Sequence, residues 1–156
     1  MTDLDDLYQS IILDHNRRPR NFGELASANR RASGRNPLCG DEVTVWLRLD
    51  GERIADISFV GKGCAISKAS SSLMTEAVRG HTRDEAMVIF ERVHALLTGA
   101  LEPTADRQPL GQIVALGGVS RFPVRVKCAS LGWHAFRNAL TSDDLALTTP
   151  AVDVSA

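Results

Sequence analysis

Three cysteines are the residues of this sequence best suited to chemistry. Cys39, Cys64 and Cys128 are odd in number and cannot all pair within one chain, so a disulfide framework is the least favoured interpretation. A free cysteine has three other roles, as a small buried hydrophobe, a metal ligand or a nucleophile. The residues that flank each cysteine help to choose among these roles.

The surroundings of Cys39 and Cys64 favour chemistry over packing. Cys39 lies in the segment Asn-Pro-Leu-Cys-Gly-Asp, whose turn-forming residues belong at a surface. Cys64 follows Gly63 and opens a predicted helix, where the helix dipole favours the thiolate. Because neither cysteine lies in an apolar run, we interpret both as candidate metal ligands or nucleophiles.

A carboxylate stands close enough to Cys39 to join it on one ion. Asp41 is two positions further on, and in an extended segment the two side chains leave the same side of the backbone. Three thiolates and one carboxylate would complete a tetrahedral zinc shell. The wide spacing of the cysteines favours a shared site only slightly over scattered packing cysteines.

The remaining candidates for chemistry are weaker. A phosphate-binding loop and a complete dinucleotide turn are both missing from the sequence, which argues against ATP or NAD chemistry. The run Ser70–Ser72 is expected to have no nearby partner histidine, lacks the glycines of a nucleophile elbow, and is interpreted as helix surface and packing. The histidines are interpreted as surface or satisfied core residues, and His134 should face away from an ion on Cys128; the four are His15, His81, His94 and His134.

A hairpin and a series of helices must position these residues. Alternating apolar residues predict strands over 43–49 and 53–60, joined by Asp50-Gly51, with Ala55, Ile57 and Phe59 facing inward on the second strand. Helical periodicity predicts helices over 3–14, 64–80, 82–99 and 123–140, the last with Val124, Cys128, Leu131 and Ala135 on one stripe. Gly117-Gly118 predicts a turn. Strands followed by helices, without alternation, indicate an α+β fold with a small antiparallel sheet packed against several helices.

Length and charge exclude several classes of protein. The chain has 156 residues, 44% of them apolar, and a formal net charge of −1, so we expect one domain over 1–145 with a flexible tail over 146–156. The charge argues against a general nucleic-acid binder, and no apolar run is long enough to span a membrane. We therefore expect a soluble, cytoplasmic protein. Arg17–Arg35 contains six arginines and one acidic residue, and is either a solvated loop or a docking region.

Three motifs, taken together and in order, resemble those of the NifU/IscU family of iron-sulfur cluster assembly proteins. They are Asn36–Asp41, Gly61–Ser67 and Arg125–Ala129, each built around one cysteine. Asp14-His15 and Pro19–Phe22 extend the resemblance, which covers about residues 4–140. The scaffold branch has a histidine directly before the third cysteine, whereas this chain has Lys127 and extra residues ending at 116–123. Both features are similar to the SufU subgroup.

The resemblance implies a function. It implies a zinc site of Cys39, Asp41, Cys64 and Cys128, and a sulfurtransferase that takes persulfide sulfur from a SufS-type cysteine desulfurase, activates that enzyme, and serves downstream iron-sulfur assembly proteins. It also points to Cys39 as the sulfur acceptor, in agreement with its place in a loop between Pro37 and Gly40. Two alternatives stay open: a scaffold on which a cluster is assembled, and an interaction module whose zinc is only structural.

Overall fold

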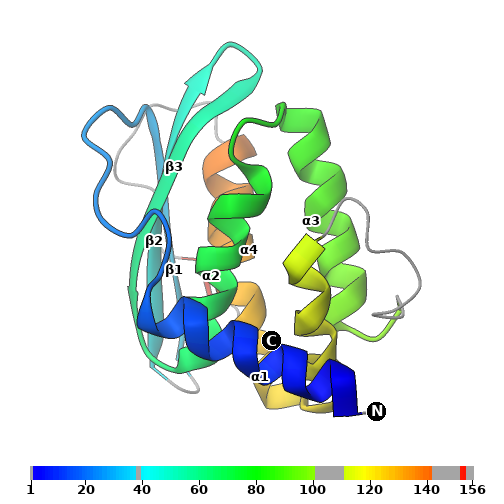
Figure 1. Ribbon diagram of the computed structural model, residues 1–156. Coiled ribbons are helices and arrows are strands. Elements are labelled where there is room, and N and C mark those ends of the chain that lie inside the picture. Colours follow the sequence, from blue (N-terminus) through cyan, green and yellow to red (C-terminus); the bar gives the residue numbers. More distant parts are fainter. Residues whose placement is uncertain (1, 38–39, 101–110, 142–151, 154–156) are drawn as a thin grey trace.

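A four-stranded sheet and a layer of helices make up the fold, as the computed structural model shows for residues 2–37, 40–100, 111–141 and 152–153 (Figure 1). The strands are β1 (Arg30–Asn36), β2 (Asp41–Asp50), β3 (Arg53–Lys62) and β4 (Val152–Asp153), in the order β3-β2-β1-β4. The helices are α1 (Thr2–Arg17), α2 (Ala65–Val78), α3 (Arg83–Leu97), the 3-10 helix η1 (Gly111–Arg121) and α4 (Pro123–Thr141). α2 and α4 lie against the sheet, and α3 lies on their far side (Figure 1). The predicted α+β class is confirmed.

The predicted hairpin is present as β2 and β3, which pair antiparallel around Asp50 and Gly51. Val43, Val45 and Leu47 are buried, as the alternation predicts. The inward face of β3 differs from the prediction at one position. Ile54 is fully buried, whereas Ala55, which was expected to face inward, is only partly buried. A register irregularity between Arg48 and Leu49 causes this difference, since an inserted residue changes which side chains face the core.

The prediction missed β1 and β4. β1 occupies the end of the basic stretch Arg17–Arg35 and pairs antiparallel with β2, so the stretch is not one solvated loop. Its buried positions are Ala32, Gly34 and Asn36, which give no apolar alternation. β4 pairs parallel with β1 and falls in the expected flexible tail, the rest of which lies outside the described residues.

The helices agree with the sequence except in three details. α1 continues to Arg17, beyond the predicted end at residue 14. As predicted, α3 begins with the capping box of Thr82 and Glu85, and α2 ends shortly before Gly80, whose φ is +85°. Gly117-Gly118 lies inside η1 instead of forming a separate turn. Val124 is 65% exposed and so is not on the buried part of the α4 stripe. Among the described residues, the helices are too short or too polar for a membrane crossing.

Three serines of α2 are more deeply buried than the sequence suggests. Ser70, Ser71 and Ser72 are fully buried, so the surface half of their interpretation is wrong and the packing half is right. The Ser70 hydroxyl donates to the Ala129 carbonyl at 2.6 Å, and Trp133 Nε1–H donates to Ser70 Oγ at 3.1 Å. Small hydroxyl side chains allow α2 and α4 to approach closely, and the hydrogen bonds satisfy the buried polar atoms of Ser70.

Candidate metal centre

Three of the four predicted ligands come together at the end of the sheet where β3 leads into α2. Asp41 is the first residue of β2, Cys64 precedes α2 and Cys128 lies in α4. One carboxylate oxygen and the two Sγ atoms all lie within 4.8 Å of one another. We call these three residues the Asp41 cluster. Segments far apart in the sequence therefore supply one compact set of metal-ligating atoms.

The Asp41 carboxylate is held by the loop that carries Cys64. Asp41 is fully buried, and the Cys64 backbone N–H donates to its Oδ1 at 2.8 Å. The other oxygen, Oδ2, lies 3.6 Å from Cys64 Sγ. Because one oxygen is already engaged by the backbone, the carboxylate has a fixed orientation that turns Oδ2 toward the sulfur.

Cys64 forms the N-cap of α2. Its backbone is extended, with φ −76° and ψ 162°, and its Sγ accepts from the Ser67 N–H at 3.5 Å. A sulfur in the N-cap position lies among the unpaired amides of the first turn, which favour negative charge. The position suits a thiolate, as the sequence indicated.

Gly63 is the residue that lets the Cys64 loop approach Asp41. Its φ is +135°, a conformation that residues with a side chain rarely adopt. A Cβ at this position would lie 2.7 Å from Asp41 Cγ and 2.9 Å from Asp41 Cα, closer than real contacts allow. This role of Gly63 could not be predicted from the sequence, because the residue that Gly63 approaches, Asp41, belongs to a distant strand.

Cys128 completes the cluster from α4. It is 3% exposed in the second turn of α4, as the predicted stripe requires. Cys39 lies outside the described residues, between Pro37 and Gly40 in the loop that joins β1 to β2. At the base of this loop the Gly40 N–H donates to the Asn36 carbonyl at 2.8 Å. The place of Cys39 in the site therefore remains a prediction.

The donor set of the Asp41 cluster fits zinc. Zinc accepts sulfur and carboxylate oxygen together, and three protein ligands leave one position for a further ligand. A cation among these groups would also balance a carboxylate and thiolates whose burial is otherwise costly. Zinc bound here would hold the ligand thiols deprotonated near neutral pH.

The histidines are placed as the sequence predicted, outside this cluster. His134 packs against Phe90 and His94 of α3, with ring centroids 5.8 and 6.4 Å away. Burial lowers the pKa of His134 below its ordinary value, and the nearby positive charge of Arg137 lowers it further. This histidine is therefore neutral at pH 7 and belongs to the contact between α3 and α4.

A serine and a histidine do meet elsewhere, contrary to the sequence interpretation. His15 Nδ1 lies 2.7 Å from Ser72 Oγ, and His15 Nε2 lies 3.8 Å from the Glu76 carboxylate. The order serine, histidine, carboxylate is that of a hydrolytic triad. However, Ser72 and His15 are both fully buried, and Ser72 Oγ also accepts from the Arg20 N–H at 2.8 Å. The group links α1 and the following turn to α2, and no substrate can reach it.

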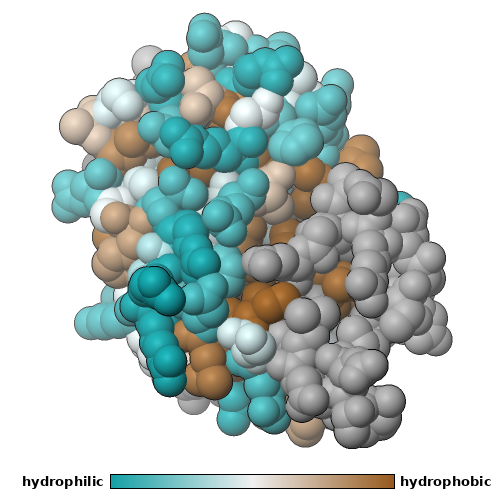
Figure 2. Space-filling view, in the orientation of Figure 1, coloured by the Kyte–Doolittle hydropathy of each residue, from teal (hydrophilic) through white to brown (hydrophobic). Residues whose placement is uncertain are grey.

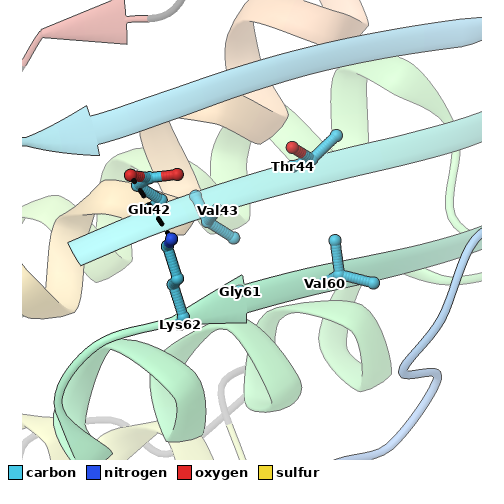
Figure 3. A pocket seen from close by; sticks show the side chains of 6 residues that line it. All are labelled: Glu42, Val43, Thr44, Val60, Gly61 and Lys62. Atoms are coloured by element: carbon cyan, nitrogen blue, oxygen red, sulfur yellow. Dashed lines mark ion pairs between the residues drawn. The ribbon is translucent and has the colours of Figure 1, made fainter.

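A shallow pocket of about 270 Å³ lies on the β2–β3 hairpin, near the strand ends that carry Asp41 and Gly63 (Figure 3). An ion pair at 3.9 Å between Glu42 and Lys62 stands at one side of it (Figure 3). The pocket contains none of the predicted ligands among its lining residues, which are Glu42, Val43, Thr44, Val60, Gly61 and Lys62. The candidate functional site is therefore the Asp41 cluster and not the pocket.

Comparison with known proteins identifies the family of this chain. The family described as NifU-like N terminal domain matches residues 7–129. The zinc-dependent sulfurtransferase SufU of Bacillus subtilis is 38% identical over 141 residues, covering 90% of this chain and 94% of its own. The iron-sulfur cluster assembly scaffold protein IscU of Streptococcus pyogenes is 36% identical over 140 residues, covering 90% and 86%.

Solved structures show the same fold. A crystal structure from Fervidobacterium islandicum, described as an iron-sulfur cluster assembly scaffold protein for the SUF system, has a TM-score of 0.79 at 35% identity and covers 86% of this chain and 97% of its own. A NifU-like protein from Brucella abortus has a TM-score of 0.77 at 26% identity, covering 87% and 93%. The resemblance predicted from the three cysteine motifs is thereby confirmed, and the chain belongs to the NifU/IscU family as a NifU-like N-terminal domain.

Proposed function

We propose that this protein serves iron-sulfur cluster assembly as a zinc-dependent sulfur acceptor for a SufS-type cysteine desulfurase, and passes the sulfur to downstream assembly proteins. The observation that carries this proposal is the convergence of Asp41, Cys64 and Cys128, whose ligand atoms lie within 4.8 Å. Similarity to a relative named as a zinc-dependent sulfurtransferase supports it. We place the reaction in the cytoplasm, where reducing conditions keep thiols free.

The transfer needs one thiolate on this protein and no outside oxidant. The Cys39 thiolate attacks the outer sulfur of a persulfide on the desulfurase. A new S–S bond forms on Cys39 as the S–S bond of the donor breaks, and the donor cysteine leaves as a thiolate. Asp41, Cys64 and Cys128 are the residues that would still hold zinc while Cys39 carries the sulfur.

Cys39 is the preferred acceptor because of its position in the chain, between two strands. Cys64 caps α2 and Cys128 lies within α4, so packing fixes the backbone of both. Cys39 belongs to the connection between β1 and β2, and connecting loops are the parts of a fold best able to bring a residue to a partner.

Mass spectrometry tests this assignment directly. The protein is incubated with a SufS-type desulfurase and cysteine, and the peptides are analysed without reduction. We expect a mass increase of about 32 Da, the mass of one sulfur atom, on the peptide that contains Cys39. Sulfur on Cys64 or Cys128 instead, or full activation of the desulfurase by Cys39→Ala, would contradict it.

The second candidate function is a scaffold for a cluster, and the similarity to proteins named IscU scaffolds favours it. The lysine before the third cysteine, Lys127, stands where the scaffold branch has a histidine, and this substitution supports the sulfurtransferase. Absorption spectra of protein purified without oxygen separate the two functions, because zinc is colourless and iron-sulfur clusters absorb visible light. A brown protein with stoichiometric iron would favour the scaffold.

A purely structural zinc module is the remaining alternative. It predicts that the protein binds zinc yet leaves the turnover of a desulfurase unchanged. The proposed function predicts a higher turnover of cysteine by the desulfurase when the protein is added, and a loss of that increase in Cys39→Ala. Measuring alanine release with and without the protein decides between them.

A further inference from the structure

An exposed apolar turn lies at the start of α4, about one helical turn before Cys128 of the Asp41 cluster. Arg121, Phe122, Pro123, Val124 and Arg125 are all exposed, with Phe122 at 52% and Val124 at 65%. Large apolar side chains this exposed are few among the described residues; the others are Leu13, Phe22 and Val88, and each lies on a different element or connection. Two of them only two positions apart form a patch that calls for an explanation. We call residues 121–125 the α4 turn.

The α4 turn is held in one conformation by its own backbone. The Phe122 N–H donates to the Val119 carbonyl at 2.8 Å, and the Arg125 and Val126 N–H groups donate to the Phe122 carbonyl at 2.8 and 3.1 Å. Pro123 begins the helix, where its fixed φ suits the first turn. A surface ordered in advance costs less entropy when a partner binds to it.

The position of Val124 ties this patch to the site. Val124 lies four residues before Cys128, so the two share one face of α4. Along that face Cys128, Leu131 and Ala135 are buried, while Val124 stands outside the core. The apolar stripe of α4 thus extends one turn beyond the core, directly next to a cluster ligand. A protein that brings a sulfur atom to the cluster must come close to this turn.

Charge indicates the chemistry of the partner. Residues 121–141 contain Arg121, Arg125, Lys127 and Arg137 and no aspartate or glutamate. Cations near the N-terminus of a helix are unfavourable, because the helix dipole is positive there. Carboxylates on a partner would offset this cost, and they would complement the arginines at both ends of the apolar pair.

We propose that the α4 turn is the docking element for the sulfur donor, which presents to it an apolar recess bordered by Asp and Glu side chains. This inference rests on the proposed function, since it takes the cysteine desulfurase as the partner. Phe122 and Val124 fill the recess, and Arg121 and Arg125 pair with its border. The guanidinium of Arg121 already lies 5.8 Å from the Phe122 ring, so charge and apolar surface are presented together.

The test measures binding to the SufS-type cysteine desulfurase of the same organism by titration, with desulfurase turnover recorded in parallel. In Phe122→Ser/Val124→Thr we expect Kd to rise about tenfold or more, because truncating central apolar anchors removes most of the affinity of an interface. The maximal turnover at saturating protein should stay that of the parent, since neither residue is a cluster ligand. In Arg125→Glu the rise in Kd should be larger at low salt than at high salt.

The matched control is Val88→Thr, which changes an equally exposed apolar residue on α3. It should leave Kd unchanged, and zinc content and melting temperature should be the same in all variants. Parent-like Kd in the double variant, with an active parent, would overturn the docking proposal and leave the proposed function intact. A parent that neither binds nor activates the desulfurase would overturn both.

Discussion

At the scale of single residues, Gly63 decides whether the carboxylate of the Asp41 cluster can be placed. Its positive φ and the lack of room for a Cβ beside Asp41 are two separate constraints. In Gly63→Ala we expect backbone strain of about 1–3 kcal/mol and a displaced Asp41. Zinc affinity should therefore fall by at least about tenfold, which is 1.4 kcal/mol. Competition with a chromophoric chelator measures this affinity.

Gly80→Ala is the control for this prediction. Gly80 also has a positive φ, +85°, but a Cβ there would meet nothing within 4 Å. The two variants share the strain and differ in the collision with Asp41. Both should lower the melting temperature, and only Gly63→Ala should weaken zinc binding. Equal zinc affinity in the two variants would show that Gly63 does not position the carboxylate.

At the scale of elements, the sequence predicts what local patterns encode. The β2–β3 hairpin follows from alternation and from Asp50-Gly51, and α3 from its capping box, because these signals lie within the elements themselves. β1 was missed because its buried positions include Gly34 and Asn36, which leave no apolar period. The three cysteine motifs pointed to the residues of the Asp41 cluster, which the structure brings together, whereas the approach of Gly63 to Asp41 depends on pairing between distant segments.

The contact between α3 and α4 makes stability depend on pH through His134. Its pKa is lowered in the folded protein by burial and by Arg137 and His94 nearby, so the unfolded chain takes up a proton first. Above the ordinary pKa of 6.5 His134 is neutral in the folded and the unfolded protein, so its protonation does not change the free energy of unfolding there. As pH falls below that value, the parent should lose stability relative to His134→Gln. Urea unfolding of both proteins at pH 7.5 and 5.5 measures the difference in their free energies of unfolding. The same change with pH in both proteins would show that His134 does not cause the pH dependence.

The start of the basic stretch should speed association with the partner by long-range electrostatic attraction, without being part of the docking surface. Arg17 and Arg18 are exposed, and Arg18 lies 3.9 Å from the Asp14 carboxylate. Arg20 pairs more closely with Asp14, at 2.6 Å, and its backbone N–H donates to Ser72. Arg20 belongs to the fold and must stay. In Arg17→Glu/Arg18→Glu we expect slower association with the desulfurase at low salt and parent-like rates at 1 M salt. Stopped-flow measurement of association rates tests this prediction. Unchanged rates at low salt would show that the two arginines do not steer the partner.

At the scale of the whole molecule, one hydrophobic core joins the sheet to the helices, and a mainly hydrophilic face covers it (Figure 2). Hydrophilic residues make up most of the described surface on the face shown in Figure 2, with smaller hydrophobic patches among them. Inside, the sheet is joined to α2 and α4 by one continuous core. The Asp41 cluster lies where these three elements meet, so a metal bound there would link β2, α2 and α4 directly.

Zinc should therefore stabilise the whole fold and not only its own loop. We expect one zinc per chain, which elemental analysis measures, and a lower melting temperature after chelation. At free zinc 100-fold above Kd the lost stabilisation is about 2.7 kcal/mol, or roughly 5–10 °C for a chain of this size. Hydrogen exchange should rise at the start of β2 and the first turn of α2, and less in α3, which supplies no ligand. An unchanged melting temperature, substoichiometric zinc, or zinc bound by Asp41→Ala as tightly as by the parent would each show that the cluster does not hold the ion.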